Sequence, residues 1–357
     1  MSSTVSTVPE QKLVISGPVF PVRKGEITQA PSARQRLLDV VFRKACYAFA
    51  WLTMVLVASI VLRIAIAATP AIRSLGLGFL TGRVWDANAS QFGILAPIWG
   101  TLYTSILALI LGSLAGVAAA VFLSEGFLSF AVFAILKRFK LHLNPITRAL
   151  PDQIERLLKE LIELLAAIPS VVYGLWGIFV VIPLIRPYCN WLHANVGWLP
   201  FFSTDLSGPG ILPAVIVLAI MILPTVTAIS RDALVAVPPK LRMAAYGLGA
   251  TRWESIFAVI LPTASRGIFG GIILAFGRAL GETMALAMLV GNSNQIKLSL
   301  FSPANTLAAL LANNFPEAGP TEVGILMYAA LILLAITLAV NIIGAVILQR
   351  AALMHAD

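Results

Sequence analysis

The chain has 357 residues, of which 59% are hydrophobic and 11% are charged, and its mean hydropathy is +0.91. A soluble domain carries about 25% charged residues, so this composition excludes a soluble protein and predicts an integral membrane protein. The formal net charge of +9 does not by itself indicate a nucleic-acid partner, because Lys and Arg concentrate in the cytoplasmic loops of membrane proteins.

The first 45 residues are polar and irregular, and they contain Pro9, Pro18, Pro21 and Pro31. They lack the early apolar run of a signal peptide. We expect residues 1–45 to form a cytoplasmic tail that is mostly disordered and ends in a basic, membrane-facing helix near residues 34–44.

Six apolar runs follow the tail. A hydrocarbon core about 30 Å thick requires roughly 20 apolar residues per helix, and each of the runs meets this requirement. The sequence therefore predicts an all-α membrane protein with six transmembrane helices in a domain over 46–350, followed by a short cytoplasmic tail, 351–357. The predicted spans are 46–68, 98–123, 161–185, 211–230, 268–290 and 325–348.

The basic residues are distributed unevenly between the two sides of this arrangement. Most of the 25 Lys and Arg lie in the N-terminal tail, the second loop, the fourth loop and the C-terminal tail, whereas the alternate loops hold only Arg73, Arg83, Arg186 and Lys297. Because Lys and Arg mark cytoplasmic loops, this distribution places both termini and the loop at 237–262 in the cytoplasm.

Glycine and proline punctuate the spans. Gly112 and Gly116 share G-x-x-x-G spacing, as do Gly267/Gly271 and Gly277/Gly281, and small residues at this spacing let helix backbones approach closely in lipid. Prolines within the third and fourth spans free backbone carbonyls that must be satisfied by protein or by a water-lined cavity. This combination is typical of a bundle that lines a path; the prolines are Pro169, Pro183, Pro213 and Pro224.

The second loop contains an insert at residues 126–156. Its apolar run of ten residues is too short to span a membrane, and Lys137, Arg138 and Lys140 follow it. We expect a re-entrant or interfacial segment whose basic residues face lipid headgroups. A charged helix over 148–159 then leads into the third span.

The most informative stretch is the fourth loop, MAAYGLGATRWESIFAVILP, Met243–Pro262. Its pattern predicts a helix with Ala244, Ala245 and Leu248 on one face, a break at Gly249, and a second helix with an apolar stripe of Trp253, Ile256 and Phe257. Such a helix pair fits a groove on a partner protein. The alternative is a loop that packs on its own bundle.

Two ionisable residues lie within the fifth predicted span, Arg278 and Glu282. Ionisable residues at membrane depth are costly and mark ion or substrate paths, and a guanidinium matches tetrahedral oxyanions such as phosphate. A spacing of four places both on one helical face, so Glu282 pairs with Arg278 when no substrate is bound. The predicted path residues are Arg278, Glu282 and Thr283; the alternative is an ion pair that only permits packing.

The chain lacks a G-x-x-x-x-G-K-[ST] motif, and His142, His193 and His355 are scattered without metal-ligand spacing. We therefore predict a non-enzymatic chain with no cofactor or metal of its own.

Four segments resemble a known family: ELLAAIPSVVYGLWGIFVVIP, AIMILPTVTAISRDAL, VPPKLRMAAYGLGATRW and GRALGETMALAMLVGN. Together, in this order, they are similar to the PstC family, permease subunits of the bacterial high-affinity phosphate ABC importer, and lean to it over the partner permease PstA. The likeness covers roughly residues 40–350.

This resemblance implies a type I ABC-importer permease (MetI-like) fold in the bacterial inner membrane and import of phosphate by alternating access. The implied partners are a PstA-like permease, a PstB-like ATPase dimer that binds ATP-Mg, a PstS-like phosphate-binding protein and a PhoU-like regulator. It makes Met243–Pro262 the ATPase-coupling loop; its predicted coupling residues are Met243, Ala244, Ala245, Gly249, Ala250, Trp253, Phe257, Leu261 and Pro262.

Two features depart from the family pattern. Met243 stands where the family's coupling loop usually opens with Glu, and the second loop is unusually long. Three alternatives stay open: a permease for sulfate, molybdate or phosphonate; a phosphate-sensing subunit with secondary transport; and an ion-coupled transporter, which the docking element argues against.

Overall fold

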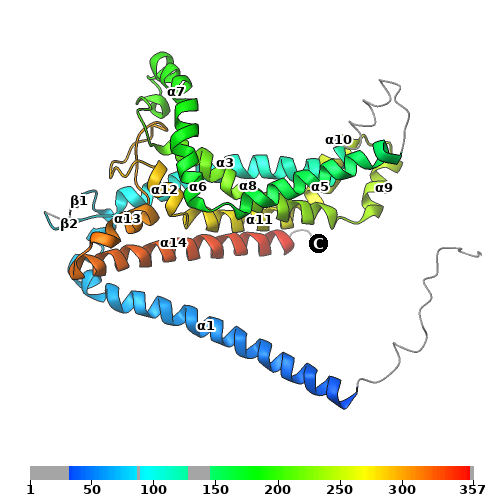
Figure 1. The fold of residues 1–357 in the computed structure, drawn as a ribbon, viewed down its shortest axis with the longest axis horizontal. Coiled ribbons are helices and arrows are strands. Elements are labelled where there is room, and N and C mark those ends of the chain that lie inside the picture. Colours follow the sequence, from blue (N-terminus) through cyan, green and yellow to red (C-terminus); the bar gives the residue numbers. More distant parts are fainter. Residues whose placement is uncertain (1–31, 87–88, 128–144, 354–357) are drawn as a thin grey trace, which may run out of the picture. The chain divides into compact units, whose positions relative to one another are not determined.

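The computed structural model describes residues 32–86, 89–127 and 145–353 (Figure 1). The predicted tail, except for its last residues, and residues 128–144 of the predicted insert lie outside this range. The chain divides into two compact units, Met1–Ile60 and Val61–Asp357, and the bundle treated below belongs to the second. Its strands are β1 (Trp85–Asp86) and β2 (Gln91–Phe92). The helices are α1 (Ala33–Leu75), α2 (Gly78–Thr81), α3 (Leu95–Ser124), α5 (Pro145–Ala167), α6 (Ser170–Trp176), α7 (Ile182–Val196), α8 (Ile211–Val235), α9 (Pro239–Gly247), α10 (Arg252–Ser255), α11 (Leu261–Leu280), α12 (Met284–Leu289), α13 (Leu307–Asn314) and α14 (Pro320–Leu353).

Six helical runs of the described chain are long and apolar enough to cross a membrane, which confirms the predicted number. They are Ala33–Leu75, Leu95–Ser124, Ser170–Val196, Ile211–Val235, Arg252–Leu280 and Pro320–Arg350. The prediction of an all-α protein is confirmed apart from the antiparallel pair β1–β2, which is only two residues long in each strand.

The third span is displaced from its predicted position at 161–185. Helix α5 ends at Ala167, and a new helical run begins at Ser170 and continues through a π-helical segment, Gly177–Val181, to Val196. Pro169 separates the two, because a proline disfavours helical geometry in the residue before it. The charges on α5 keep it out of the span, and the predicted charged helix over 148–159 is confirmed as part of α5.

The fifth span is displaced toward the N-terminus. It runs over Arg252–Leu280 instead of the predicted 268–290, and it contains a π-helical segment, Ile256–Ile260. The helix ends before Gly281, and the short helix α12 begins at Met284. The apolar character of residues 281–290 predicts a continuous helix, but hydropathy does not show that the helix ends at Gly281.

Helix α8 forms the centre of the bundle and is the most buried of the six candidate spans. It packs against α3 on one side and against α11 on another. In Figure 1, α9 and α10 lie at one end of these long helices, and α7 and α13 lie at the other. The main apolar cluster joins α8 residues such as Leu218 and Ile222 to Tyr173 of α6 and Leu289 of α12.

Glycine spacing explains the closeness of α8 to its neighbours. A Cβ atom on Gly112 would lie 2.7 Å from Cγ1 of Ile222 and 2.9 Å from the carbonyl oxygen of Ala219. Gly267 and Gly271 of α11 likewise face Ala233 and Ile229 of α8. The predicted close packing is thus confirmed for these pairs.

The two glycines of the third predicted pair, Gly277 and Gly281, have different roles. Gly277 faces Asn341 of α14, whereas Gly281 ends α11 and makes no close approach. This is consistent with the role of Gly281 as a helix terminator instead of a packing residue.

Replacement of Gly112 by Ala tests the α3–α8 contact. The added methyl group meets both a side chain and a backbone oxygen, and overpacking of this kind costs about 1–3 kcal/mol. We expect a lower melting temperature of the purified protein in detergent. Gly270→Ala is the matched control, because a Cβ atom there meets nothing within 4 Å. Equal melting temperatures for the two variants would contradict the close contact.

Candidate functional site

Arg278 lies in the last turn of α11, immediately before the break that separates α11 from α12. Its Nη1 donates a hydrogen bond of 3.3 Å to Oγ1 of Thr225 on α8, and its side chain remains exposed. A cation at a helix C-terminus is stabilised by the partial negative charge of the unpaired carbonyls. The guanidinium is therefore held at one point and keeps donors available for a ligand.

Thr225 follows Pro224, which lies inside α8. Proline has no N–H, so it cannot donate to the carbonyl of Ile220 one turn earlier. The Thr225 hydroxyl and the carbonyl of Ile220, which lacks its usual helical donor, are therefore two polar groups within an otherwise apolar span. Sequence analysis identified Pro224 but missed Thr225, because the partner is 53 residues away from Arg278.

The predicted pairing of Glu282 with Arg278 is wrong for this structure. Among the ion pairs of the described residues, none joins these two side chains. The helix ends at Leu280, so the spacing of four no longer places them on one face. The Glu282 carboxylate instead accepts from the N–H of Ala285 at 3.5 Å, and the Thr283 hydroxyl donates to the carbonyl of Gly281 at 3.1 Å. Both side chains shape the break, and no intrahelical ion pair stabilises packing here.

The loop predicted to dock a partner folds as helix α9, a tight turn and a second helix. This second helix begins at Arg252 and continues directly as the fifth span, so the predicted end of the loop at Pro262 lies inside that span. Helix α9 ends at Gly247, and Gly249 has a φ of 85°, a left-handed conformation that favours glycine. The predicted break at Gly249 is confirmed. A capping box starts α10: the Thr251 N–H donates to Oε2 of Glu254 at 2.7 Å, and the Glu254 N–H donates to the Thr251 hydroxyl. The spacing T-x-x-E is the signal that identifies it.

Some of the apolar residues predicted to form the faces of this loop are buried, and others are exposed. Ala245 and Ile256 are buried, whereas Met243, Leu248 and Phe257 are exposed, Leu248 to 91%. Leu248 stands outside α9 at its C-cap, so the predicted face with Ala244 and Ala245 is not formed as one surface. Of the other predicted coupling residues, Ala244, Gly249, Trp253 and Pro262 are exposed, and Ala250 and Leu261 are partly buried. The loop thus presents an uneven, partly apolar outer surface.

A buried ion pair fastens this loop to the bundle. Nη1 of Arg242 on α9 lies 2.6 Å from Oε1 of Glu125, at the end of α3, and Nη2 donates to the carbonyl of Leu234 on α8 at 2.7 Å. The Glu125 side chain is only 5% exposed. Arg242 therefore joins α9 to the ends of two spans. Sequence analysis did not predict this contact, because the two residues are 117 positions apart.

Aromatic residues form a second contact between the loop and the end of α3. Trp253 lies 4.9 Å from Phe127 and 6.0 Å from Phe257, as measured between ring centroids. The Arg252 guanidinium lies 4.3 Å from the centre of the Phe127 ring, within the range of a cation–π interaction. Phe127 is the last described residue before the part of the predicted insert that lies outside the structure.

No cluster of three metal-ligating side chains occurs in the parts of the chain that the structure describes. The site is thus composed of one cation at a helix break, two flanking polar side chains, and a separate loop joined to the bundle by Arg242.

Comparison with known protein families gives a match over residues 148–352 to the model described as "Binding-protein-dependent transport system inner membrane component". This range includes most of α5, the helix break at Arg278 and the loop at 237–262. The chain therefore belongs to the family of inner-membrane components of binding-protein-dependent transport systems.

Curated relatives narrow this class. The chain is 37% identical over 321 residues to the phosphate transport system permease protein PstC of Haemophilus influenzae, an alignment that covers 88% of this chain and 95% of the relative. It is 36% identical to the PstC protein of Mesorhizobium japonicum, over 89% of this chain and 92% of the relative. The probable PstC protein of Methanocaldococcus jannaschii is 34% identical over 78% of this chain and 82% of its own length.

Among solved structures, the chain is similar to one from the inward-facing MetNI methionine ABC transporter. The TM-score is 0.49 at 16% sequence identity, and the match covers 72% of this chain and 95% of that one.

Loss of the Glu125 carboxylate tests the attachment of α9. Removing one partner of a buried ion pair costs about 3–5 kcal/mol, because it leaves the other charge uncompensated. We expect Glu125→Ala to speed amide hydrogen exchange in residues 239–247 and the exchanged charges Glu125→Arg/Arg242→Glu to restore part of the protection.

Glu160→Ala on the exposed side of α5 serves as the control for this measurement. Unchanged exchange in Glu125→Ala would show that α9 does not depend on the ion pair.

Proposed function

We propose that this protein is the transmembrane permease subunit of an ATP-driven importer that passes inorganic phosphate from an extracytoplasmic binding protein to the cytoplasm by alternating access. The observation that carries this proposal is a permanent cation, Arg278, kept exposed at a helix break within the bundle. A planar guanidinium offers several donors that match the oxygens of a tetrahedral oxyanion. The names of the PstC relatives favour phosphate over other oxyanions.

The loop at 237–262 is the proposed coupling element. It carries exposed apolar side chains such as Met243 and Leu248, and it is connected to α3 and α8 through Arg242. A partner ATPase that binds this surface transmits its closure to two spans at once. ATP and Mg belong to that partner, and this subunit makes and breaks no covalent bond.

The family description supports a binding protein as a partner, and the PstC-named relatives support the more specific assembly that we propose. This assembly consists of this chain and a PstA-like permease as a heterodimer, a PstB-like ATPase dimer, a PstS-like binding protein and a PhoU-like regulator, in a bacterial plasma membrane. Both termini are cytoplasmic in this proposal, because Lys and Arg concentrate on their side.

Two other functions are distinguished by experiment. A permease for sulfate, molybdate or phosphonate predicts that these anions compete with labelled phosphate. A phosphate-sensing subunit predicts variants that lose uptake and keep signalling.

Neutralising Arg278 is the direct test of the substrate path. We expect Arg278→Gln to abolish uptake of labelled phosphate while the complex still assembles, because the neutral amide no longer attracts the anion. Arg266→Gln, on the same helix α11, is the matched control and should retain uptake. Near-normal uptake by Arg278→Gln would place the path elsewhere.

Changes at the turn of the loop test the docking surface. Gly249→Pro forces φ to about −65° where the turn requires a positive φ, and Ala250→Glu adds a charge beside the turn. Both variants should release the ATPase or leave ATP hydrolysis uncoupled from phosphate uptake. Gly247→Ala is the control and should do neither, because a Cβ atom at this position meets nothing within 4 Å. Unchanged copurification of the ATPase together with unchanged coupling would contradict the docking role.

A further inference from the structure

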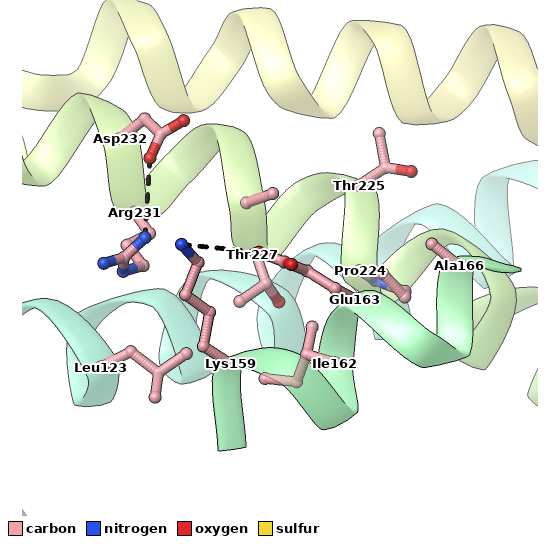
Figure 2. A pocket seen from close by; sticks show the side chains of 11 residues that line it. Leu123, Lys159, Ile162, Glu163, Ala166, Pro224, Thr225, Thr227, Arg231 and Asp232 are labelled. Carbon is pink, nitrogen blue, oxygen red and sulfur yellow. Dashed lines mark ion pairs between the residues drawn. The ribbon is translucent and has the colours of Figure 1, made fainter. Parts of the chain in front are cut away.

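A cavity of about 270 Å³, lined by both apolar and charged side chains, lies between α5 and α8, close to the end of α3 (Figure 2). Helix α5 contributes Lys159 and Glu163, and α8 contributes Thr225, Arg231 and Asp232. A second cavity of about 230 Å³ shares Leu123, Lys159 and Arg231 with the first. Its other lining residues are Glu155 and Arg156.

Two cations from different helices thus line the same cavities. Lys159 and Arg231 both extend into the space between α5 and α8 in Figure 2. Their mutual repulsion is a cost that a bound anion would offset.

Each cation also has a carboxylate nearby. Nζ of Lys159 is 3.6 Å from Oε1 of Glu163, and Nη1 of Arg231 is 3.8 Å from Oδ1 of Asp232. Both distances are long, and the carboxylates are more exposed than the cations, Asp232 to 79% against 29% for Arg231. Exposed ion pairs of this kind contribute little to stability, so a ligand can displace the carboxylates at small cost.

The cavity and the Arg278 site have one residue in common. Thr225 lines the cavity and also accepts the hydrogen bond of Arg278, so the two sites share one side chain. Arg231 follows Thr225 by six residues on α8, a rise of about 9 Å along the helix. An anion released from Arg278 toward the α9 end of the bundle meets Lys159 and Arg231 next.

We propose that the cavity between Lys159 and Arg231 is a second phosphate-group site, which holds inorganic phosphate between Arg278 and the cytoplasm. The inference rests on the proposed function. Arg231 supplies a planar fork of donors and Lys159 a point charge, a combination that suits phosphate oxygens. Glu163 and Asp232 compete with the anion for these cations, which keeps the binding weak enough for release, as conduction through successive sites requires.

The phosphate group has two possible sources in a membrane, inorganic phosphate and a lipid headgroup. We call the cavity the exit site, because in the proposal it holds inorganic phosphate on its way from Arg278 to the cytoplasm. A lipid headgroup that occupies the cavity would overturn this proposal. The experiment therefore separates the two.

Accessibility of a cysteine in the cavity measures occupancy directly. Ala228 lines the cavity and is exposed, so Ala228→Cys in a Cys46→Ser background places a thiol there while Cys189 stays buried. The full complex is labelled from the cytoplasmic side with an anionic methanethiosulfonate reagent. We expect inorganic phosphate to slow labelling several-fold, and Lys159→Gln/Arg231→Gln to remove this protection.

The lipid source is tested with the same thiol. Labelling is compared in phospholipid nanodiscs and in detergent free of phospholipid, each with and without inorganic phosphate. Protection by inorganic phosphate in both media supports the exit site. Protection that depends on phospholipid and ignores inorganic phosphate would overturn it.

Uptake of labelled phosphate by the reconstituted complex separates this inference from the proposed function. Lys159→Gln/Arg231→Gln should reduce uptake several-fold, and the matched pair Lys44→Gln/Arg350→Gln, outside the cavity, should not. One combination of results would overturn the exit site alone: the wild type takes up phosphate, the Lys159→Gln/Arg231→Gln variant takes it up equally well, and inorganic phosphate does not protect the Ala228→Cys thiol from labelling. Absence of ATP-dependent phosphate uptake in the wild type would overturn the proposed function, and the exit site with it.

Discussion

The close approach of α3 and α11 to the central helix α8 is the constraint on which the rest of the structure depends. Glycines at positions such as Gly112 and Gly267 bring neighbouring helices against the side chains of α8 at distances that a Cβ atom would not allow. Lipid supplies no hydrophobic drive for helix association, so van der Waals contact between small residues must hold the bundle together. These contacts fix the position of helix α8, and they also fix the positions of its polar groups Thr225 and Arg231.

Three functional elements depend on this placement of α8. Thr225, beside Pro224, accepts a hydrogen bond from Arg278, and Arg231, farther along, lines the same cavity as Lys159. The carbonyl of Leu234, in the last turn, accepts a hydrogen bond from Arg242 of the proposed coupling loop. A displacement of α9 by a partner is therefore applied to the same helix that holds the proposed substrate contact. The Arg242–Glu125 ion pair extends this connection to α3. The missing family Glu at position 243 does not leave the loop without a charged anchor, because Arg242 is bound to the bundle beside it.

The six spans, the helix–turn–helix loop and the glycine contacts could be predicted from the sequence, because apolar runs, a single Gly249 and small residues at fixed spacing act locally. The limits of the third and fifth spans could not, since hydropathy alone does not show where Pro169 or Gly281 ends a helix. The pairing of Arg278 with Glu282 failed for the same reason: it assumed an unbroken helix. The partners Thr225 and Glu125 lie far from Arg278 and Arg242 in sequence, and only the packing of separate helices brings them together. The T-x-x-E spacing of Thr251 and Glu254 could have predicted the start of α10 from the sequence, but it was not used for this.

The central claim is that this chain carries inorganic phosphate inward at the expense of ATP. The most direct measurement is uptake of labelled phosphate at sub-micromolar concentration by cells that lack this chain, with and without the restored gene, in the presence of unlabelled phosphate, sulfate, molybdate or phosphonate as competitors. The account predicts that restoration returns ATP-dependent uptake and that only unlabelled phosphate competes strongly. Uptake that never depends on the chain, or that another of these oxyanions suppresses equally well, would contradict it.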